Sequence, residues 1–368
     1  TNESGNDDLP TVDFNATSSN GSESVSSKAL TVDLSAASGR DVTVAYVITG
    51  TASGSGTDFT LANGTLTISA GDTSGVITIA SIVNDSSAEN NETVIVTLSS
   101  PDNATLGSDQ VHTYTINDND NPPSLSINDV SGNETAGNRE FTVTLSAASG
   151  RDVTVNYATS DGTATSAADY TATSGSLTIA AGATTATFNV GVLADTLDED
   201  NETVTLTLSG ATNATISDAT GTLTITDDDA TPSLSINDIS HNETAANRTF
   251  TVTLSAASGL AVTVNYVTSN GTATAGADYT AISATTLTFS PGQTTKTFNV
   301  AVLADSLDEA NETVTLTISS ASNASISNAE ATGTLTINDD DATPSLSIAD
   351  VSNNETAGNR EFTVTLSA

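Results

Sequence analysis

The sequence is built on a repeat of about 110 residues, and this repeat limits the folds that are open to the chain. The segment Pro123–Asp129 (PSLSIND) returns at Pro232–Asp238 and, as PSLSIAD, at Pro344–Asp350. A diverged copy begins at Pro10, so successive copies start 113, 109 and 112 residues apart. A period of this length is the size of a small domain and too long for a solenoid unit. The 368 residues therefore predict three full domains and the start of a fourth, like beads on a string.

The copies divide the chain into five segments. We expect the end of a preceding linker at 1–9, repeat one at 10–121, repeat two at 122–230, repeat three at 231–342, and the first two strands of a fourth repeat at 343–368. Two strands alone are marginally stable and expose their edges. We therefore expect the fourth copy either to be cut from a longer array, which we favour, or to complete a neighbouring subunit by strand donation.

Within each repeat, apolar residues alternate with polar ones, which is the pattern of half-buried β-strands. Repeat two contains seven such runs, at 125–127, 141–145, 153–157, 177–179, 188–192, 204–208 and 223–225. No window has the stripe of an amphipathic helix. The pattern predicts an all-β chain of tandem seven-stranded antiparallel sandwiches of the immunoglobulin type.

The charge balance is strongly acidic, with 45 Asp and Glu against 7 Lys and Arg and a formal net charge of −38. Nucleic acid and anionic membrane surfaces are poor partners, because both are bound by basic faces. Cysteine is absent, so disulfides and cysteine-based zinc sites are excluded. No apolar run approaches the roughly 20 residues of a membrane helix, and we expect no membrane insertion in this segment.

The carboxylates are concentrated in two places of each repeat. In repeat two these are the loop Ala194–Val204 and the triplet Asp227–Asp229, and nearly the same text recurs at Ala304–Glu309 and Asp339–Asp341. Two carboxylates about 4 Å apart repel by roughly 4 kcal/mol at an effective dielectric constant of 20. Such density requires protons or a cation, and Ca²⁺ takes six to eight oxygen ligands of this kind. The alternative is a solvated acidic surface in a salt-tolerant protein.

The order of the motifs resembles that of Calx-beta domains. Repeat two carries, in sequence, Asn133–Gly137 (NETAG), Phe141–Ser146 (FTVTLS), Asp161–Ala164 (DGTA), Ala168–Tyr170 (ADY), Asp195–Glu202 and the acidic triplet. The resemblance implies seven-stranded sandwiches whose calcium ligands lie together at one end. It also implies a tandem repeat array of a microbial surface or extracellular protein.

The resemblance identifies the residues that would hold calcium. In repeat two these are Glu134, Asp169, Asp195, the Leu197 carbonyl, Glu199, Asp227, Asp228 and Asp229. In repeat three they are Glu243, Asp278, Asp305, Glu309, Asp339, Asp340 and Asp341, and in repeat one they are Glu23, Asp58, Asp85, Glu89, Asp118 and Asp120. Ala194, Ala304 and Asn84 stand where strong binders have a second acid, so we expect one or two ions per repeat rather than four.

Asn-X-Ser/Thr sequons recur at equivalent positions of the repeats. The candidate glycosylation sites are Asn91, Asn201 and Asn311, then Asn103, Asn213 and Asn323, then Asn133, Asn242 and Asn354. These are acceptors only in a protein that meets a glycosylation machinery. A chain rich in Asn, Ser and Thr also produces sequons by chance, so both interpretations stay open.

The sequence indicates a non-enzymatic, extracellular or cell-surface array, such as a fibre, stalk or filament subunit, made rigid by Ca²⁺ at the joints between repeats. No nucleophile–base pair or phosphate loop is visible, so we expect no enzyme in this segment. The expected partners are Ca²⁺ and either identical subunits or ligands on a host or cell surface. Two alternatives are a calcium-sensing regulatory module and an adhesin ectodomain that binds a carbohydrate or a receptor.

Overall fold

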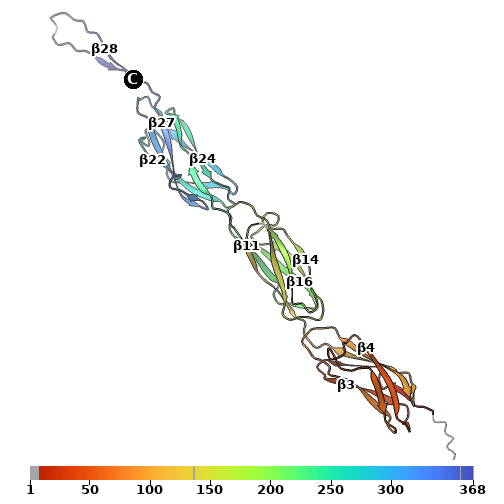
Figure 1. Cartoon of the computed structure of the whole chain (residues 1–368). Coiled ribbons are helices and arrows are strands. Elements are labelled where there is room, and N and C mark those ends of the chain that lie inside the picture. The colour runs from red at the N-terminus through yellow and green to blue at the C-terminus, as the bar shows by residue number, and fades with distance from the viewer. Residues whose placement is uncertain (1–7, 136, 357, 368) are drawn as a thin grey trace, which may run out of the picture.

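The computed structural model describes residues 8–135, 137–356 and 358–367. It shows three β-sandwiches arranged end to end, followed by a small two-stranded sheet (Figure 1). Each sandwich combines a four-stranded and a five-stranded sheet. Among the described residues there is no helix, and hence none with the length and apolar character needed to cross a bilayer.

The strands of repeat one are β1 (Thr11–Phe14), β2 (Ser18–Ser22), β3 (Ser27–Leu34), β4 (Val42–Gly50), β5 (Gly64–Ile68), β6 (Ser74–Ala80), β7 (Glu92–Asp102), β8 (Thr105–Leu106) and β9 (Val111–Asn117). The four-stranded sheet has the order β6-β3-β1-β8, and the five-stranded sheet has the order β2-β9-β7-β4-β5. The other two sandwiches repeat this arrangement.

The strands of repeat two are β10 (Ser124–Ile127), β11 (Val130–Asn133), β12 (Gly137–Leu145), β13 (Val153–Asp161), β14 (Ser174–Ile179), β15 (Thr185–Val192), β16 (Glu202–Thr212), β17 (Thr215–Ile216) and β18 (Thr220–Thr226). The strands of repeat three are β19 (Ser233–Ile236), β20 (Ile239–Asn242), β21 (Ala246–Leu254), β22 (Val262–Asn270), β23 (Thr285–Phe289), β24 (Thr295–Val302), β25 (Glu312–Ser322), β26 (Ser325–Ile326) and β27 (Thr332–Asn338). Beyond them, β28 (Leu346–Ile348) pairs antiparallel with β29 (Val364–Leu366).

The all-β sandwich prediction is confirmed, and each of the seven strands predicted in repeat two lies within an observed strand. Two additional strands, β11 and β17, were not predicted. Both pair in parallel, β11 with β18 and β17 with β10. The prediction of a purely antiparallel sandwich was therefore wrong for these two strands. The parallel pair β11–β18 is important for the site described below.

The chain changes sheets between β10 and β11, and two polar side chains hold this crossover. Asn128 Oδ1 accepts a hydrogen bond from the Thr142 amide at 2.7 Å, in the four-stranded sheet. Asp129 Oδ1 accepts one from the Thr222 amide at 2.8 Å, in the five-stranded sheet. Each side chain thus accepts a hydrogen bond from a strand amide that would otherwise pair with a neighbouring strand, and the two amides belong to different sheets. The chain can therefore leave the four-stranded sheet after β10 and enter the five-stranded sheet as β11.

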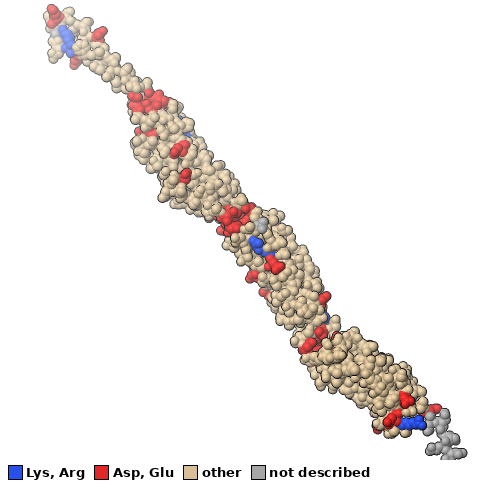
Figure 2. Space-filling model, in the orientation of Figure 1, with Lys and Arg blue, Asp and Glu red and all other residues tan. Residues whose placement is uncertain are grey.

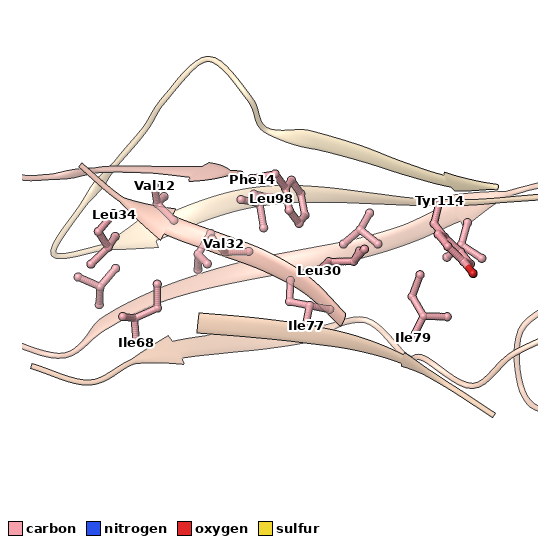
Figure 3. Close-up of a cluster of buried hydrophobic side chains, with 14 of the residues drawn as sticks. Val12, Phe14, Leu30, Val32, Leu34, Ile68, Ile77, Ile79, Leu98 and Tyr114 are labelled. Atoms are coloured by element: carbon pink, nitrogen blue, oxygen red, sulfur yellow. The ribbon is translucent and has the colours of Figure 1, made fainter. Parts of the chain in front are cut away.

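Each sandwich encloses one core of side chains contributed by both sheets. Figure 3 shows Val12 and Leu30 from one sheet of repeat one meeting Leu98 and Tyr114 from the other. Repeats two and three add an aromatic stack across the layers. In repeat two the ring centroids of Tyr157 and Phe188 are 3.9 Å apart, and those of Phe188 and Phe141 are 5.7 Å apart.

We predict that Phe188→Ala strongly destabilises repeat two, because Phe188 is the middle ring of this stack. Truncating a buried Phe typically costs about 3–5 kcal/mol, a large part of the roughly 5–15 kcal/mol that holds a domain folded. Calorimetry of the full chain should show one transition moving to lower temperature. Val76→Ala, at a side chain that is 50% exposed, is the control and should leave all transitions in place. Equal effects of the two substitutions would contradict this assignment of the core.

Candidate metal centre

The acidic side chains gather at the ends of the sandwiches, where one repeat meets the next (Figure 2). The parallel pair β11–β18 explains much of this gathering. In its register Asn133 lies opposite Thr226, and the Glu134 amide donates to the Thr226 carbonyl at 2.8 Å. Two parallel strands end at the same edge of a sheet. Glu134, which follows β11, therefore lies beside the acidic triplet that follows β18.

The first group of carboxylates in repeat two consists of Glu134, Asp227 and Asp229, and we call it the exit cluster. One oxygen of each residue lies within 4.8 Å of the others. Glu134 is buried, and its Oε1 accepts a hydrogen bond from the Asp195 amide at 3.1 Å. The exit cluster thus combines the segments that follow β11 and β18, and the Asp195 amide connects it to the loop between β15 and β16.

The second group consists of Asp169, Glu199 and Glu202, and we call it the loop cluster. One carboxylate oxygen of each of these residues also lies within 4.8 Å of the others. Asp169 is held by the Thr165 amide, which donates to its Oδ2 at 2.6 Å. The Glu199 amide donates to Asp227 Oδ1 at 3.2 Å and so connects the loop cluster to the exit cluster.

Repeat three has the same two clusters, formed by Glu243, Asp339 and Asp341 and by Asp278, Glu309 and Glu312. Repeat one has an exit cluster of different composition, Glu23, Asp85 and Asp120. Two of these acids, Glu23 and Asp85, also line a surface hollow in repeat one. The other acids that line it are Asp58, Glu89, Glu92 and Asp118.

Some of the predicted ligands lie outside the clusters. Asp228 is exposed, and its Oδ2 accepts a hydrogen bond from Thr135 Oγ1 at 2.8 Å. Asp340, its counterpart in repeat three, accepts from Asn242 Nδ2 at 3.2 Å. Asp195 is not a cluster member either, although its amide donates to Glu134 in the exit cluster. Its Oδ1 accepts a hydrogen bond from the Leu197 amide at 2.7 Å and shapes the loop. Asp305 makes the equivalent bond.

The sequence reasoning missed Glu202 and Glu312, which complete the loop clusters, and their counterpart Glu92. These glutamates open strands β16, β25 and β7. Each belongs to an Asn-Glu-Thr-Val segment that also contains a sequon. The sequence analysis placed Glu202 in the carboxylate-rich loop but not among the ligands. The exact recurrence of the glutamate in all three copies is the signal that could have found it.

The asparagines of two sequon sets have structural roles. The amide of Asp227 donates to Asn201 Oδ1 at 3.0 Å, and Asp339 bonds Asn311 in the same way at 3.1 Å. Asn213 has a positive φ of 60°, and its Nδ2 donates to the Asp152 carbonyl at 2.9 Å. These contacts give a folding reason for the recurrence of the asparagines, while glycosylation stays a prediction.

The carboxylates shift one another's protonation. Burial raises the pKa of Glu202 to about 7, and the nearby Asp169 carboxylate adds to the shift. Burial, followed by the charge of Asp195, raises the pKa of Glu199 to about 6. The same effect, with burial as the largest cause, raises the pKa of Glu23, Glu92, Glu134, Glu243 and Glu312. Without a cation, Glu23, Glu92, Glu202 and Glu312, whose pKa values rise to about 7, therefore bind protons close to neutral pH.

The donor set fits a hard divalent cation. The clusters present only carboxylate oxygens, with no imidazole or thiolate among them, and this is the ligand type that Ca²⁺ prefers. Buried oxygens of Glu23, Asp120 and Asp339 have no hydrogen-bond partner. Buried carboxylate oxygens are costly to leave unpaired, so a bound cation would satisfy an existing need.

In the presence of a chelator, we predict that the chain becomes less stable as the pH rises from about 5 to about 8. The raised pKa values mean that the folded state binds more protons than the unfolded state in this window, so the free energy of unfolding falls with rising pH. Thermal melts in chelator at several pH values measure the effect.

The matched variant carries Glu202→Gln and Glu312→Gln, which remove two of the repelling charges. It should melt at a higher temperature than the wild type at about pH 8 in chelator and depend less on pH. If the melting temperature of the wild type in chelator stays constant or rises from about pH 5 to about pH 8, repulsion between the cluster carboxylates does not destabilise the fold.

A family model agrees with this division into three repeats. The Calx-beta domain model matches residues 5–120, 118–229 and 226–341. No curated protein matches the chain. Similar solved structures include CBD12 from CALX1.2, at 19% identity over 58% of this chain and 99% of that one, with a TM-score of 0.30. The calcium binding domain CBD12 of CALX1.1 has 21% identity over 54% and 80%, with a TM-score of 0.28. The apo-form Calx CBD1 domain has 23% identity over 30% and 100%, also with a TM-score of 0.28. Because the three family matches span most of its length, the chain belongs to the Calx-beta domain family.

Proposed function

We propose that this chain is an extracellular structural or adhesive array that binds Ca²⁺ at the ends of its repeats and becomes rigid there. Calx-beta domains are calcium-binding modules of regulatory or structural rather than catalytic type. The observation that supports the proposal best is the position of the exit cluster. Asp227 and Asp229 are both cluster members and part of the short linker to Pro232.

An ion bound in the exit cluster would fix the direction in which the chain leaves the repeat. Three adjacent acids repel one another and extend a free linker. A cation shared by Glu134, Asp227 and Asp229 removes this repulsion and ties the linker to the end of β11. The site exists only when the linker lies against the end of β11. The free energy of ion binding therefore favours the ordered linker over a free one.

The number of clusters supports one or two ions per repeat. Repeats two and three each have two groups of three carboxylates, and each group offers at most six oxygens. Ca²⁺ needs six to eight oxygen ligands, so water or carbonyls would complete each site. Sites with so few protein ligands have the modest affinity of extracellular modules, whose dissociation constants for Ca²⁺ are on the order of 10⁻⁴–10⁻³ M. This supports a protein that works where calcium is abundant.

We predict that Ca²⁺ raises the melting temperature of the wild type and that Glu134→Gln or Asp229→Asn reduces this gain for repeat two. A ligand at 100 times its dissociation constant stabilises the folded state by about 2.7 kcal/mol. Asp228→Asn is the matched control, because it removes the same charge from the next residue but lies outside both clusters. Equal losses from Asp228→Asn and Asp229→Asn would contradict the assigned ligand set, and an unchanged wild-type melt would contradict calcium binding.

We also predict that Ca²⁺ narrows the distribution of angles between repeats. In small-angle scattering, the wild type in calcium should have a longer and better-defined maximum dimension than in chelator, because the linkers are held. The Glu134→Gln, Glu243→Gln chain should give similar curves in both conditions. A wild type that binds calcium with no change in scattering would favour a binding module without a mechanical role, such as a sensor or a receptor-binding ectodomain.

A further inference from the structure

The loop that carries Glu199 is also the surface on which the next repeat rests. We use the name acid loop for residues 84–91 of repeat one and 194–201 of repeat two. The backbone amide of Gly259, in repeat three, donates to the Asp198 carbonyl at 3.1 Å. Ser258 Oγ donates to the same carbonyl at 3.0 Å. One carbonyl of the acid loop is therefore held by two donors from the following domain.

The joint between repeats one and two repeats these contacts atom for atom. The Gly150 amide donates to the Ala88 carbonyl at 3.2 Å, and Ser149 Oγ donates to it at 3.2 Å. We call Ser149–Gly150 and Ser258–Gly259 the Ser-Gly corners. Both serines are almost completely buried, at 1% and 2% exposure. Two joints with the same pair of hydrogen bonds indicate a built contact rather than a chance approach of two surfaces.

The glycine of each corner packs directly against a predicted calcium ligand. A Cβ added to Gly259 would lie 2.1 Å from Glu199 Oε1 and 2.6 Å from Glu199 Cγ. A Cβ on Gly150 would lie 2.5 Å from Glu89 Cγ. Only glycine allows this approach. Because the atoms in contact belong to the end of a flexible side chain, an added methyl group would displace the carboxylate and leave the fold in place.

The corner covers the part of the acid loop that it contacts. Asp198, whose carbonyl accepts both hydrogen bonds, is buried with 8% exposure. Ala88, which accepts the same two bonds in repeat one, is 1% exposed. In both joints the following repeat thus contributes to the burial of the acid loop.

We infer that the Ser-Gly corner is a positioning element for the ion site of the preceding repeat. By fixing the Asp198 carbonyl and confining the Glu199 side chain, it holds one member of the loop cluster in place. The next repeat thus contacts the loop cluster of repeat two through Ser258 and Gly259. This inference rests on the proposed function. By linkage, ion binding and docking of the next repeat then strengthen each other to the same extent.

The test uses the full chain with Gly259→Ala and, separately, Ser258→Ala. Amide hydrogen exchange of the segment 194–204 is followed during a calcium titration, so that repeat two is monitored alone. We expect Gly259→Ala to raise the calcium concentration for half-maximal protection roughly 10-fold, the size typical of groups that orient metal ligands. The segment 84–94 of repeat one should respond as in the wild type.

Repeat one supplies the matched control. Ser38–Gly39 is the equivalent corner, and a Cβ on Gly39 would meet nothing within 4 Å. Gly39→Ala should leave every calcium midpoint unchanged. Ser258→Ala removes one hydrogen bond without adding bulk, and it keeps the test valid if Gly259→Ala disturbs repeat three. It should shift the midpoint of repeat two in the same direction.

The outcomes separate the inference from the proposed function. Midpoints of repeat two that are equal in the wild type, Gly259→Ala and Ser258→Ala would overturn the positioning role and leave calcium binding intact. A wild type whose acid loops gain no protection in calcium would overturn the proposed function itself. A shift in repeat two that is absent from repeat one would support the corner as the partner of the preceding site.

Discussion

Repulsion between carboxylates at the end of each sandwich is the constraint on which the rest of the structure depends. In the loop cluster of repeat two, Asp169, Glu199 and Glu202 offer oxygens within 4.8 Å of one another. A pair of full charges at about 4 Å repels by roughly 4 kcal/mol at an effective dielectric constant of 20, before salt weakens the interaction. Three such pairs approach the whole stability of a domain, about 5–15 kcal/mol. Protons or a cation in the cluster relieve this repulsion, and when both are absent the hydrophobic core must offset it.

The strands could be predicted from the sequence because burial on a sheet imposes a period of two residues. That period says which face a side chain occupies, but it does not say which strand is the neighbour. The crossover at Asn128 and Asp129 shows the difference, because both residues look like a turn in the sequence and act as ladder partners for two different sheets. The parallel pair β11–β18 follows from this crossover, and with it the contact between Glu134 and the triplet.

The site was only partly predictable, for two physical reasons. Along a strand such as β18, alternate side chains point to opposite sides, and the same alternation holds in the triplet that follows it. Asp227 and Asp229 thus enter the cluster while Asp228 faces solvent, a division that the period of two could have predicted. Glu202 was hidden for another reason, since the residues around it also spell a sequon. Its role depends on its nearness to Asp169, which lies 33 positions earlier and is brought close by the fold alone.

The acid loops of repeats one and two are each covered by the domain that follows. Ala88 and Asp198, whose carbonyls accept the hydrogen bonds from the Ser-Gly corners, are 1% and 8% exposed, so the surroundings of each loop depend on the neighbouring domain. No comparison within a single repeat would detect this, because the contact atoms are a backbone carbonyl and a glycine. Under the proposed function, the affinity of a loop for ions therefore depends on whether the next repeat is docked. The stiffness of a joint and the occupancy of its sites are then coupled, and a substitution at the corner changes both without removing a carboxylate from the chain.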